Sequence, residues 1–340
     1  MLRVVLGGIS VFYRLSIGFR NFCYDKGICR SRSAGVPVIS IGNITTGGTG
    51  KTPLVVWLCR YLSNKGIPNA VLTRGYKSAE EQVGDEPAML AKACPETSVV
   101  VDPDRVKGAE KAVNEHGAKV LIMDDGFQHR RLKRDLDIAA VDATCPFGYG
   151  KMLPAGLLRE PVKSLKRAQA AVITRFDLAE PGKVDETIRQ IRAISPDIAI
   201  AKAVHKLTSA KTDNNTEIPL EQLGDKKVYA FCGIGNPGAF LKNLEGCGMD
   251  LAGSKVFNDH HDYTYADLEQ IHDEAVAAGA EMVLTTEKDW VKVALFIWGE
   301  KEVFGDIVFA YLGLELDFIE GLDTITKLVD SIVTKIHFHH

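Results

Sequence analysis

The chain has 340 residues, enough to bury a large core and to form two domains, and its composition is ordinary for a soluble globular protein. It carries 41 Lys and Arg against 44 Asp and Glu, and the net charge of −3 argues against nucleic acid as a partner. The seven cysteines are scattered without a C-x-x-C pair, which predicts reduced thiols in the cytoplasm, no zinc site and no disulfide framework.

The first predicted element is a helix from Leu2 to Phe22. One side of it is apolar, while Arg3, Arg14 and Arg20 interrupt the apolar pattern and further basic residues follow. No stretch approaches the roughly 20 apolar residues that span a bilayer. A basic amphipathic helix can lie in the membrane interface. Periodicity alone equally allows a helix that packs on the surface of its own domain.

A glycine-rich loop follows the next apolar run, which extends from Val36 to Ile41 and predicts a strand. After the loop comes a helical pattern from Leu54 to Leu62. Strand, glycine-rich loop and Lys-Thr at a helix start form the layout of a phosphate-binding loop. The usual pattern has glycine where Thr45 stands, so the alternative is a glycine-rich turn that ends in Lys-Thr by chance.

The residues of this loop suit the binding of a nucleoside triphosphate. We expect Lys51 to reach the β- and γ-phosphates and the Thr52 hydroxyl to hold Mg²⁺. Glycines allow successive backbone N–H groups to turn toward one anion, and the helix N-terminus adds a partial positive charge. The residues expected to bind the phosphates in this way are Thr46, Gly47, Gly48, Thr49 and Gly50.

The chain beyond the loop alternates between strand and helix patterns. Apolar runs near 70–73, 98–101, 119–123, 136–141 and 170–173 predict strands, and helical patterns fall near 86–93, 105–115 and 184–194. This alternation predicts an α/β fold with a mostly parallel sheet of the P-loop NTPase type, flanked by helices. A polar stretch and a second alternating set predict three parts: a kinase domain over 1–206, a linker over 207–226 and a smaller α/β domain over 227–340.

A second polar signal follows the predicted strand Val120–Met123, where Asp124 and Asp125 stand side by side. A buried strand that ends in an acid delivers a carboxylate to the metal region of a phosphate-loop enzyme. Two adjacent carboxylates repel each other unless a cation or a proton relieves them, and a divalent ion is the natural relief. The alternative is that these acids cap a turn after the strand.

Taken in order, the motifs of the chain resemble those of the tetraacyldisaccharide 4'-kinase family, the lipid A 4'-kinases of Gram-negative envelopes. The resemblance covers nearly the whole chain, and its segments are specific in combination rather than singly. They are the N-terminal helix, 41–52, Thr73-Arg74-Gly75-Tyr76, Gly84-Asp85-Glu86-Pro87, Asp104-Arg105, 124–131, Leu153-Pro154-Ala155-Gly156, Leu158-Arg159-Glu160-Pro161, 257–261 and 285–289. Loops of this family commonly lack the first glycine, so Thr45 is no departure from its pattern.

The resemblance implies an ATP- and Mg²⁺-dependent kinase that phosphorylates the 4'-hydroxyl of tetraacyldisaccharide 1-phosphate, giving lipid IVA. It also implies that the protein acts at the cytoplasmic face of the inner membrane. A substrate with four acyl chains stays in the bilayer, since each buried CH₂ contributes about 0.8 kcal/mol. The helix Leu2–Phe22 is then expected to contact the membrane surface, and we expect a monomer.

Motif by motif, the resemblance also implies site residues. Asp85 is expected to accept the proton of the sugar hydroxyl, with His260 assisting it and His261 as the neighbouring alternative. Glu160 is expected to ligate the metal together with Thr52 and Asp125. The residues expected near the nucleotide are Asp124, Asp125, Arg105, Gln128, His129 and Arg159.

Asp85 and His260 fall in different predicted domains, so catalysis would require the domains to close around the substrate. Lys288 would meet the 1-phosphate of the substrate or form a structural ion pair with Glu287 or Asp289. The competing functions are a soluble phosphate-loop kinase of a small metabolite and a non-catalytic nucleotide switch.

Overall fold

The computed structural model describes residues 2–75, 85–212, 216–299, 304 and 307–334, without the side chains of 2–5 and 85. Tyr76 and Gly84 of the motifs above, and the terminal residues 337–340, therefore lie outside the described residues. The chain divides into two compact units. Unit 1 comprises Met1–His205 and Leu316–His340, and unit 2 comprises Lys206–Glu315.

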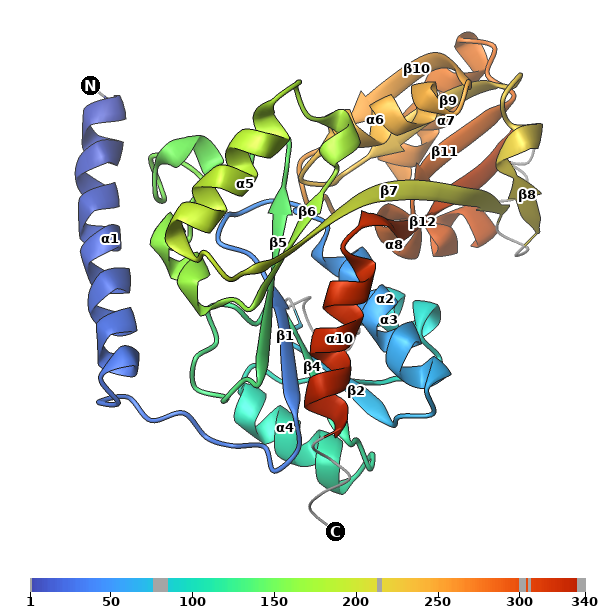
Figure 1. Ribbon diagram of the computed structural model, residues 1–340. Coiled ribbons are helices and arrows are strands. Elements are labelled where there is room, and N and C mark those ends of the chain that lie inside the picture. Colours follow the sequence, from blue (N-terminus) through green and yellow to red (C-terminus); the bar gives the residue numbers. More distant parts are fainter. Residues whose placement is uncertain (1, 76–84, 213–215, 300–303, 305–306, 335–340) are drawn as a thin grey trace. The chain divides into compact units, whose positions relative to one another are not determined.

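Unit 1 is built on a parallel sheet with the strand order β3-β2-β4-β1-β5-β6-β7 (Figure 1). Its strands are β1 (Val38–Gly42), β2 (Asn69–Thr73), β3 (Ser98–Val101), β4 (Val120–Asp124), β5 (Leu136–Asp142), β6 (Ala170–Thr174) and β7 (Ala199–Thr212). Each adjacent pair is parallel, and β1, β2, β4, β5 and β6 are buried along their whole length. Strands covered on both faces require apolar runs rather than alternation, which is the pattern of this sequence. The predicted α/β fold is confirmed.

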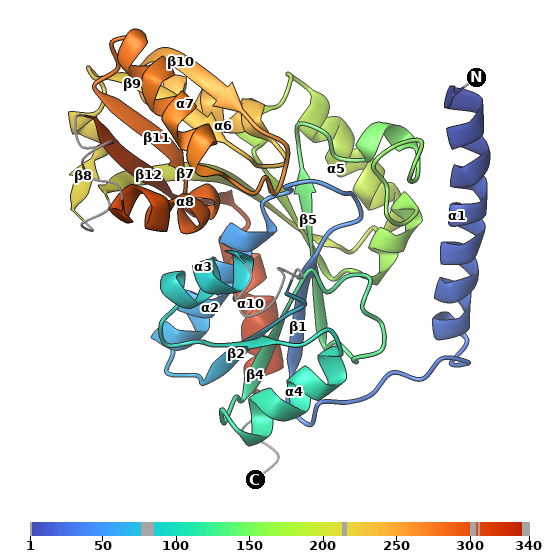
Figure 2. The ribbon, with the colours of Figure 1, turned by 180° about the vertical axis from the view of Figure 1, so that it is seen from behind.

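Helices cover both faces of this sheet, as the two opposite views show (Figures 1 and 2). They are α2 (Lys51–Asn64), α3 (Asp85–Ala93), α4 (Arg105–Asn114), α5 (Lys183–Ile194) and α10 (Leu322–Val333). The apolar side chains of α2 and α10 share one core cluster, and those of α4 and α5 belong to two others. Helices on both faces are what a parallel sheet with crossover connections requires.

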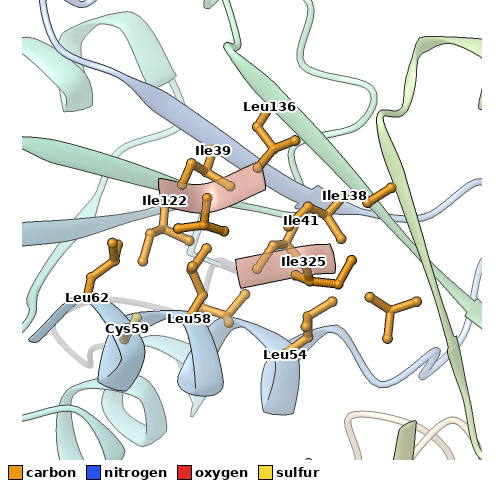
Figure 3. Packing of buried hydrophobic residues seen from close by; sticks show 14 of the residues in the cluster. Ile39, Ile41, Leu54, Leu58, Cys59, Leu62, Ile122, Leu136, Ile138 and Ile325 are labelled. Carbon is orange, nitrogen blue, oxygen red and sulfur yellow. The ribbon is translucent and has the colours of Figure 1, made fainter. Parts of the chain in front are cut away.

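The largest cluster lies between α2, α10 and the central strands (Figure 3). Leu54, Leu58 and Leu62 recur every four residues, so they fall on one face of α2, and all three are fully buried. They pack with Ile41 of β1 and with Ile325 of α10. Burial of each such side chain contributes about 1.5–3 kcal/mol. This packing fixes the N-terminus of α2 near the carboxyl end of β1.

The N-terminal helix α1 (Leu2–Asp25) runs alongside the rest of unit 1. Tyr13 and Ile17 pack against the cluster that contains α5, and Ser10 donates a hydrogen bond to the carbonyl of Met152. On the other side Phe12 and Phe19 are 76% and 70% exposed. In the described part of the chain, no helix is long and apolar enough to span a membrane.

Unit 2 contains a second set of parallel strands, in the order β10-β9-β11-β12. Its elements are β8 (Glu217–Pro219), β9 (Lys227–Cys232), α6 (Pro237–Gly246), β10 (Asp250–Val256), α7 (Tyr265–Ala277), β11 (Met282–Thr286), α8 (Glu287–Gly299) and β12 (Val308–Glu320). Two apolar clusters form its core, so it is an α/β unit of its own.

The boundaries between the two units differ from the domain boundaries expected from the sequence. Residues 207–212 continue strand β7, which alternates buried and exposed side chains, and Glu217–Pro219 pairs with it as the antiparallel β8. The expected linker over 207–226 is therefore partly strand. The last helix, α10, belongs to unit 1 because Ile325 and Val329 are buried against its sheet. Both β7 and β12 carry the chain from one unit to the other.

We predict that Gly50→Ala destabilises unit 1. Gly50 has φ +79°, and a Cβ there would lie 2.5 Å from Nε2 of His205. A left-handed alanine and a close contact together cost about 2–5 kcal/mol. Gly48→Ala is the control, because a Cβ at Gly48 meets no atom within 4 Å. Urea unfolding of the two variants compares their free energies of unfolding, and equal values would contradict the prediction.

Candidate functional site

The phosphate-binding loop ends where helix α2 begins. Gly50 is left-handed and immediately precedes Lys51, the first residue of the helix, and among the described side chains none caps this turn. The first N–H groups of α2 therefore lack a capping acceptor and carry the positive end of the helix dipole. Such a helix start is suited to bind an anion.

Hydrogen bonds from outside the loop hold its backbone and side-chain groups. Nδ2 of Asn43 donates to Oγ1 of Thr49 over 2.8 Å, and the backbone N–H of Thr46 donates to the carbonyl of Leu157 over 2.7 Å. The carbonyl of Thr49 accepts from Oγ1 of Thr174 over 2.9 Å. The N–H of Thr46, which we expected to bind phosphate, is thus engaged within the protein. The predicted loop residues form one loop, and their contact with phosphate remains a prediction.

Four residues beneath the loop, Asp142, Thr174, Arg175 and His205, were not identified from the sequence. Arg175 donates to the carbonyl of Gly48 and to the carboxylate of Asp142. The side chains of Asp142, Thr174 and Arg175 stand at the carboxyl ends of β5 and β6. His205 of β7 packs against Gly50, and its Nε2 is buried without a partner among the described residues. Polar residues directly after two predicted strands were the available signal, because parallel strands end at one edge.

The acidic pair lies at the end of β4, beside the loop. Nζ of Lys51 is 3.5 Å from Oδ1 of Asp125, and Nη1 of Arg159 donates to both carboxylate oxygens over 2.8 Å. Burial by itself would raise the pKa of Asp125, but Lys51 and Arg159 outweigh it and hold the pKa below its ordinary value. Asp125 also has φ +49°, a left-handed conformation that is uncommon for residues other than glycine.

Asp124 has a different environment although it is the adjacent residue. It is buried, and burial together with the nearby charges of Glu86 and Asp125 raises its pKa to about 7, against the opposing effects of Lys51 and Arg105. A buried carboxylate short of positive charge is a place where a cation would be stabilised.

The donor set around the loop suits Mg²⁺ by its chemistry. No group of three or more His, Cys, Asp and Glu side chains among the described residues could hold a metal ion. Thr52, Asp124 and Asp125 nevertheless supply hard oxygen atoms. Protein sites for Mg²⁺ usually contribute one or two carboxylates and leave the other positions to water and phosphate. The residues present therefore fit this ion.

Glu160, expected as a metal ligand, has protein partners in this structure. Its carboxylate is fully buried and accepts from Arg167 over 2.9 and 3.0 Å and from Asn21 of α1 over 2.8 Å. Burial would raise the pKa of Glu160, but Arg167 lowers it below its usual range. These bonds connect Glu160 to α1, a contact that the sequence did not indicate.

Arg105, Gln128 and His129 lie near the acidic pair. Arg105 begins α4 and is buried, and its charge acts on Asp124. Gln128 donates to the carbonyl of Asn43 over 2.8 Å. Burial and the cations Arg105, Arg20 and Arg74 lower the pKa of His129 to about 4, so this imidazole is neutral at pH 7.

In unit 2, His260 and His261 have distinct surroundings. His261 stacks on Phe257 and its Nε2 is 3.2 Å from Asp267, so it is engaged in the packing of the unit. His260 has φ +63° and lies 3.3 Å from Nζ of Lys288. Nζ of Lys288 pairs with a carboxylate oxygen of Asp259 at 3.0 Å.

Asp85 and His260 belong to different units, and their pairing stays a prediction. Asp85 is the first residue of α3, and its side chain lies outside the described part. His260 follows β10 at the edge of unit 2 where its parallel strands end.

We predict that His205→Leu reduces the acid sensitivity of the protein. Burial and Arg175 lower the pKa of His205 to about 3, whereas an unfolded histidine has a pKa of about 6.5. Between these values the unfolded state binds the extra proton, so the native protein loses stability as the pH falls below about 6.5. At pH 5 this loss is about 2 kcal/mol, and it is absent in the variant.

Urea unfolding at pH 8 and pH 5 measures this difference. The exposed His116→Leu variant is the control and should follow the parent protein. If the free energy of unfolding fell by the same amount from pH 8 to pH 5 in the parent and in His205→Leu, the prediction would be contradicted.

Comparisons with known proteins agree with this arrangement. The family model described as tetraacyldisaccharide-1-P 4'-kinase matches residues 2–333. The tetraacyldisaccharide 4'-kinase of Anaeromyxobacter dehalogenans (strain 2CP-C) is 37% identical over 301 residues, which cover 83% of this chain and 79% of the relative. That of Chlorobaculum tepidum is 37% identical over 313 residues, which cover 86% of this chain and 87% of the relative.

A solved structure extends the likeness to three dimensions. The crystal structure of LpxK from Aquifex aeolicus in complex with ATP has a TM-score of 0.74 and 31% sequence identity, and the match covers 98% of this chain and 100% of that one. The family match and these relatives extend over most of the chain, which confirms the resemblance read from the motifs. The chain belongs to the tetraacyldisaccharide-1-P 4'-kinase family.

Proposed function

We propose that this chain transfers the γ-phosphate of ATP to the 4'-hydroxyl of tetraacyldisaccharide 1-phosphate at the cytoplasmic face of the inner membrane, and that it acts as a monomer. One observation carries the proposal: the lysine of the phosphate-binding loop lies 3.5 Å from the second acid of the pair at the end of β4. The loop and the acids thus belong to one site, in a chain whose family is that of the 4'-kinases.

The roles of the residues follow from the charge that phosphoryl transfer must neutralise. Catalysis of this reaction depends mainly on positioning and on electrostatic stabilisation. Lys51 would neutralise the migrating phosphoryl group, and Gly47, Gly48 and Gly50 would direct backbone N–H groups at the phosphates. Arg159 would exchange its bonds to Asp125 for contact with phosphate, because a planar guanidinium binds both kinds of oxyanion in the same way.

Magnesium would be held by oxygen atoms of Thr52, Asp125 and Glu160, with Asp124 close by. When bound, Mg²⁺ supplies positive charge that stabilises the triphosphate and the charge that develops during transfer. For Glu160 this requires release from Arg167 or sharing with it. The raised pKa of Asp124 supports a cation in this region, since such a charge would favour the ionised carboxylate.

The sugar hydroxyl must lose its proton as it attacks. Asp85 would accept the proton, and His260 would orient and tune it. We assign this role to His260 rather than His261 because His260 follows Asp259 in the motif; Nε2 of His260 lies 3.3 Å from Nζ of Lys288, whereas Nε2 of His261 lies 3.2 Å from Asp267. This pairing requires closure of the two units on the substrate, with motion in the connecting strands β7 and β12.

We predict that Lys51→Ala and Asp85→Asn abolish most lipid phosphorylation. The assay incubates purified protein with γ-labelled ATP and tetraacyldisaccharide 1-phosphate and measures labelled bisphosphorylated lipid. Each variant should lower kcat by at least about 100-fold, since each removes stabilisation or proton transfer in the transition state. Asp85→Asn should leave the affinity for ATP nearly unchanged.

Lys107→Ala, an exposed position on α4, is the control and should retain full activity. His260→Ala should lower kcat more than His261→Ala in a protein that remains folded. Labelled lipid formed at the parental rate by Lys51→Ala would refute the proposed reaction, and slow ATP hydrolysis without labelled lipid would indicate a nucleotide switch.

We predict that the exposed face of α1 binds the protein to membranes. Phe12, Leu15 and Phe19 are exposed at neighbouring turns of the helix, and burial of each in the interface contributes about 1.5–3 kcal/mol. A Phe12→Ser/Leu15→Ser/Phe19→Ser variant should lose flotation with liposomes. Replacement of three exposed apolar residues of α8, namely Leu295, Phe296 and Trp298, by Ser is the control. Unchanged flotation of the α1 variant would contradict the prediction.

A further inference from the structure

A cavity of about 750 Å³ lies between α1 and the segment 149–163 of unit 1. Leu6 and Val11 form apolar parts of its wall on α1, and Met152 and Leu158 form apolar parts of the opposite wall. Its volume falls within the range of ligand pockets, and its walls suit a hydrocarbon chain.

Three cationic side chains line the same cavity: Arg14 of α1 and Lys151 and Lys163 of the opposite segment. All three residues are exposed. None of them forms an ion pair with a carboxylate of the described residues. Apolar walls beside unpaired cations complement an amphiphile with an anionic head.

Hydrogen bonds hold the two walls together. Oγ of Ser10 donates to the carbonyl of Met152 over 2.9 Å, and the hydroxyl of Tyr13 donates to the carbonyl of Arg159 over 3.1 Å. The flank of α1 that borders the cavity continues into its exposed apolar face, because Val11 is 56% exposed and precedes Phe12. A chain in the cavity would therefore lie beside the face that we propose to enter the membrane interface.

We propose that this cavity binds one anionic glycerophospholipid of the bilayer, with an acyl chain between the apolar walls and its phosphate at Arg14, Lys151 and Lys163. This inference depends on the proposed membrane contact of α1, and it goes beyond the kinase reaction. In the described part of the chain, none of the residues assigned to the phosphoryl transfer lines the cavity. The proposed lipid is thus a second ligand, bound in addition to the disaccharide substrate.

The cavity and the transfer site share one segment of the chain. Leu158 and Pro161 line the cavity, while Arg159 between them bonds to Asp125 and Glu160 bonds to Arg167. A lipid in the cavity would stabilise this segment and thereby the positions of Arg159 and Glu160. The membrane would then support the site as well as supply its substrate.

Two adjacent glycines of α1 provide a matched test of occupancy. Gly7 lines the cavity, Gly8 does not, and a Cβ at either meets no atom within 4 Å. Gly7→Trp would fill the cavity, whereas Gly8→Trp adds the same side chain to the same helix at an exposed position. The full chain and both variants are incubated with vesicles of phosphatidylcholine and phosphatidylglycerol, extracted, and weighed by native mass spectrometry.

The parent and Gly8→Trp should retain one phosphatidylglycerol, and Gly7→Trp should retain about tenfold less, because its indole occupies the apolar space. Three results would overturn the proposal: no retained lipid on the parent, equal retention by both variants, or retention of phosphatidylcholine as readily as phosphatidylglycerol. A parent that floats with vesicles without retaining a lipid would refute the cavity site alone. A parent that does not float would refute the membrane contact.

The cations require a separate variant, Arg14→Gln/Lys151→Gln/Lys163→Gln. It should retain at least about tenfold less phosphatidylglycerol, since each basic residue near an anionic lipid contributes about a fivefold factor. Lys107→Gln/Lys111→Gln/Lys119→Gln removes the same charge from exposed positions near α4 and should bind as the parent does. Equal losses in both triple variants would assign the effect to net charge. Displacement of the retained lipid by tetraacyldisaccharide 1-phosphate would instead assign the cavity to the substrate.

Discussion

The direction of the peptide groups in the loop before α2 is the constraint on which the rest of the site depends. A short loop can bind a triphosphate only if its N–H groups point at the anion and its carbonyl oxygens point elsewhere. In this protein the carbonyl oxygens of Gly48 and Thr49 accept hydrogen bonds from Arg175 and Thr174, which follow or end β6. The packing of α2 against β1 and α10 then fixes the start of the helix at the loop. The sheet thus supplies both the scaffold and the donors that orient the loop.

Charge balance at the loop explains why two adjacent acids behave differently. Asp125 has Lys51 and Arg159 as close partners, so its carboxylate is stabilised in the ionised form. Asp124 is buried and its pKa is raised to about 7, because its neighbours include Glu86 and Asp125 as well as Lys51 and Arg105. An ATP-dependent kinase has to bring additional negative phosphate to this place. The protein groups around Asp124 thus leave it short of positive charge, and a divalent cation would supply that charge.

Most of the regular structure could be predicted, and the misses share a cause. The apolar runs that became β1, β4, β5 and β6 are buried on both faces, so their sequences carry a strong signal. Part of the stretch expected as a linker is the end of strand β7, which has polar residues on its exposed side and passes between the two units. Helix α10 follows unit 2 in sequence but packs in unit 1. Packing between residues far apart in sequence decides which unit such a helix or strand joins, and local sequence patterns carry no information about that packing.

The sequence by itself determined the phosphate-binding loop, the acidic pair, the apolar face of α1 and the family, since each is carried by residues that are contiguous or periodic. Only the tertiary structure decided which partners those residues have. Glu160 is held by Arg167 and Asn21, His205 packs beneath Gly50, and the cavity beside α1 has walls from two distant segments. The reason is physical: a motif specifies the chemistry of its own residues, whereas burial, charge pairing and cavities arise between residues that only folding brings together.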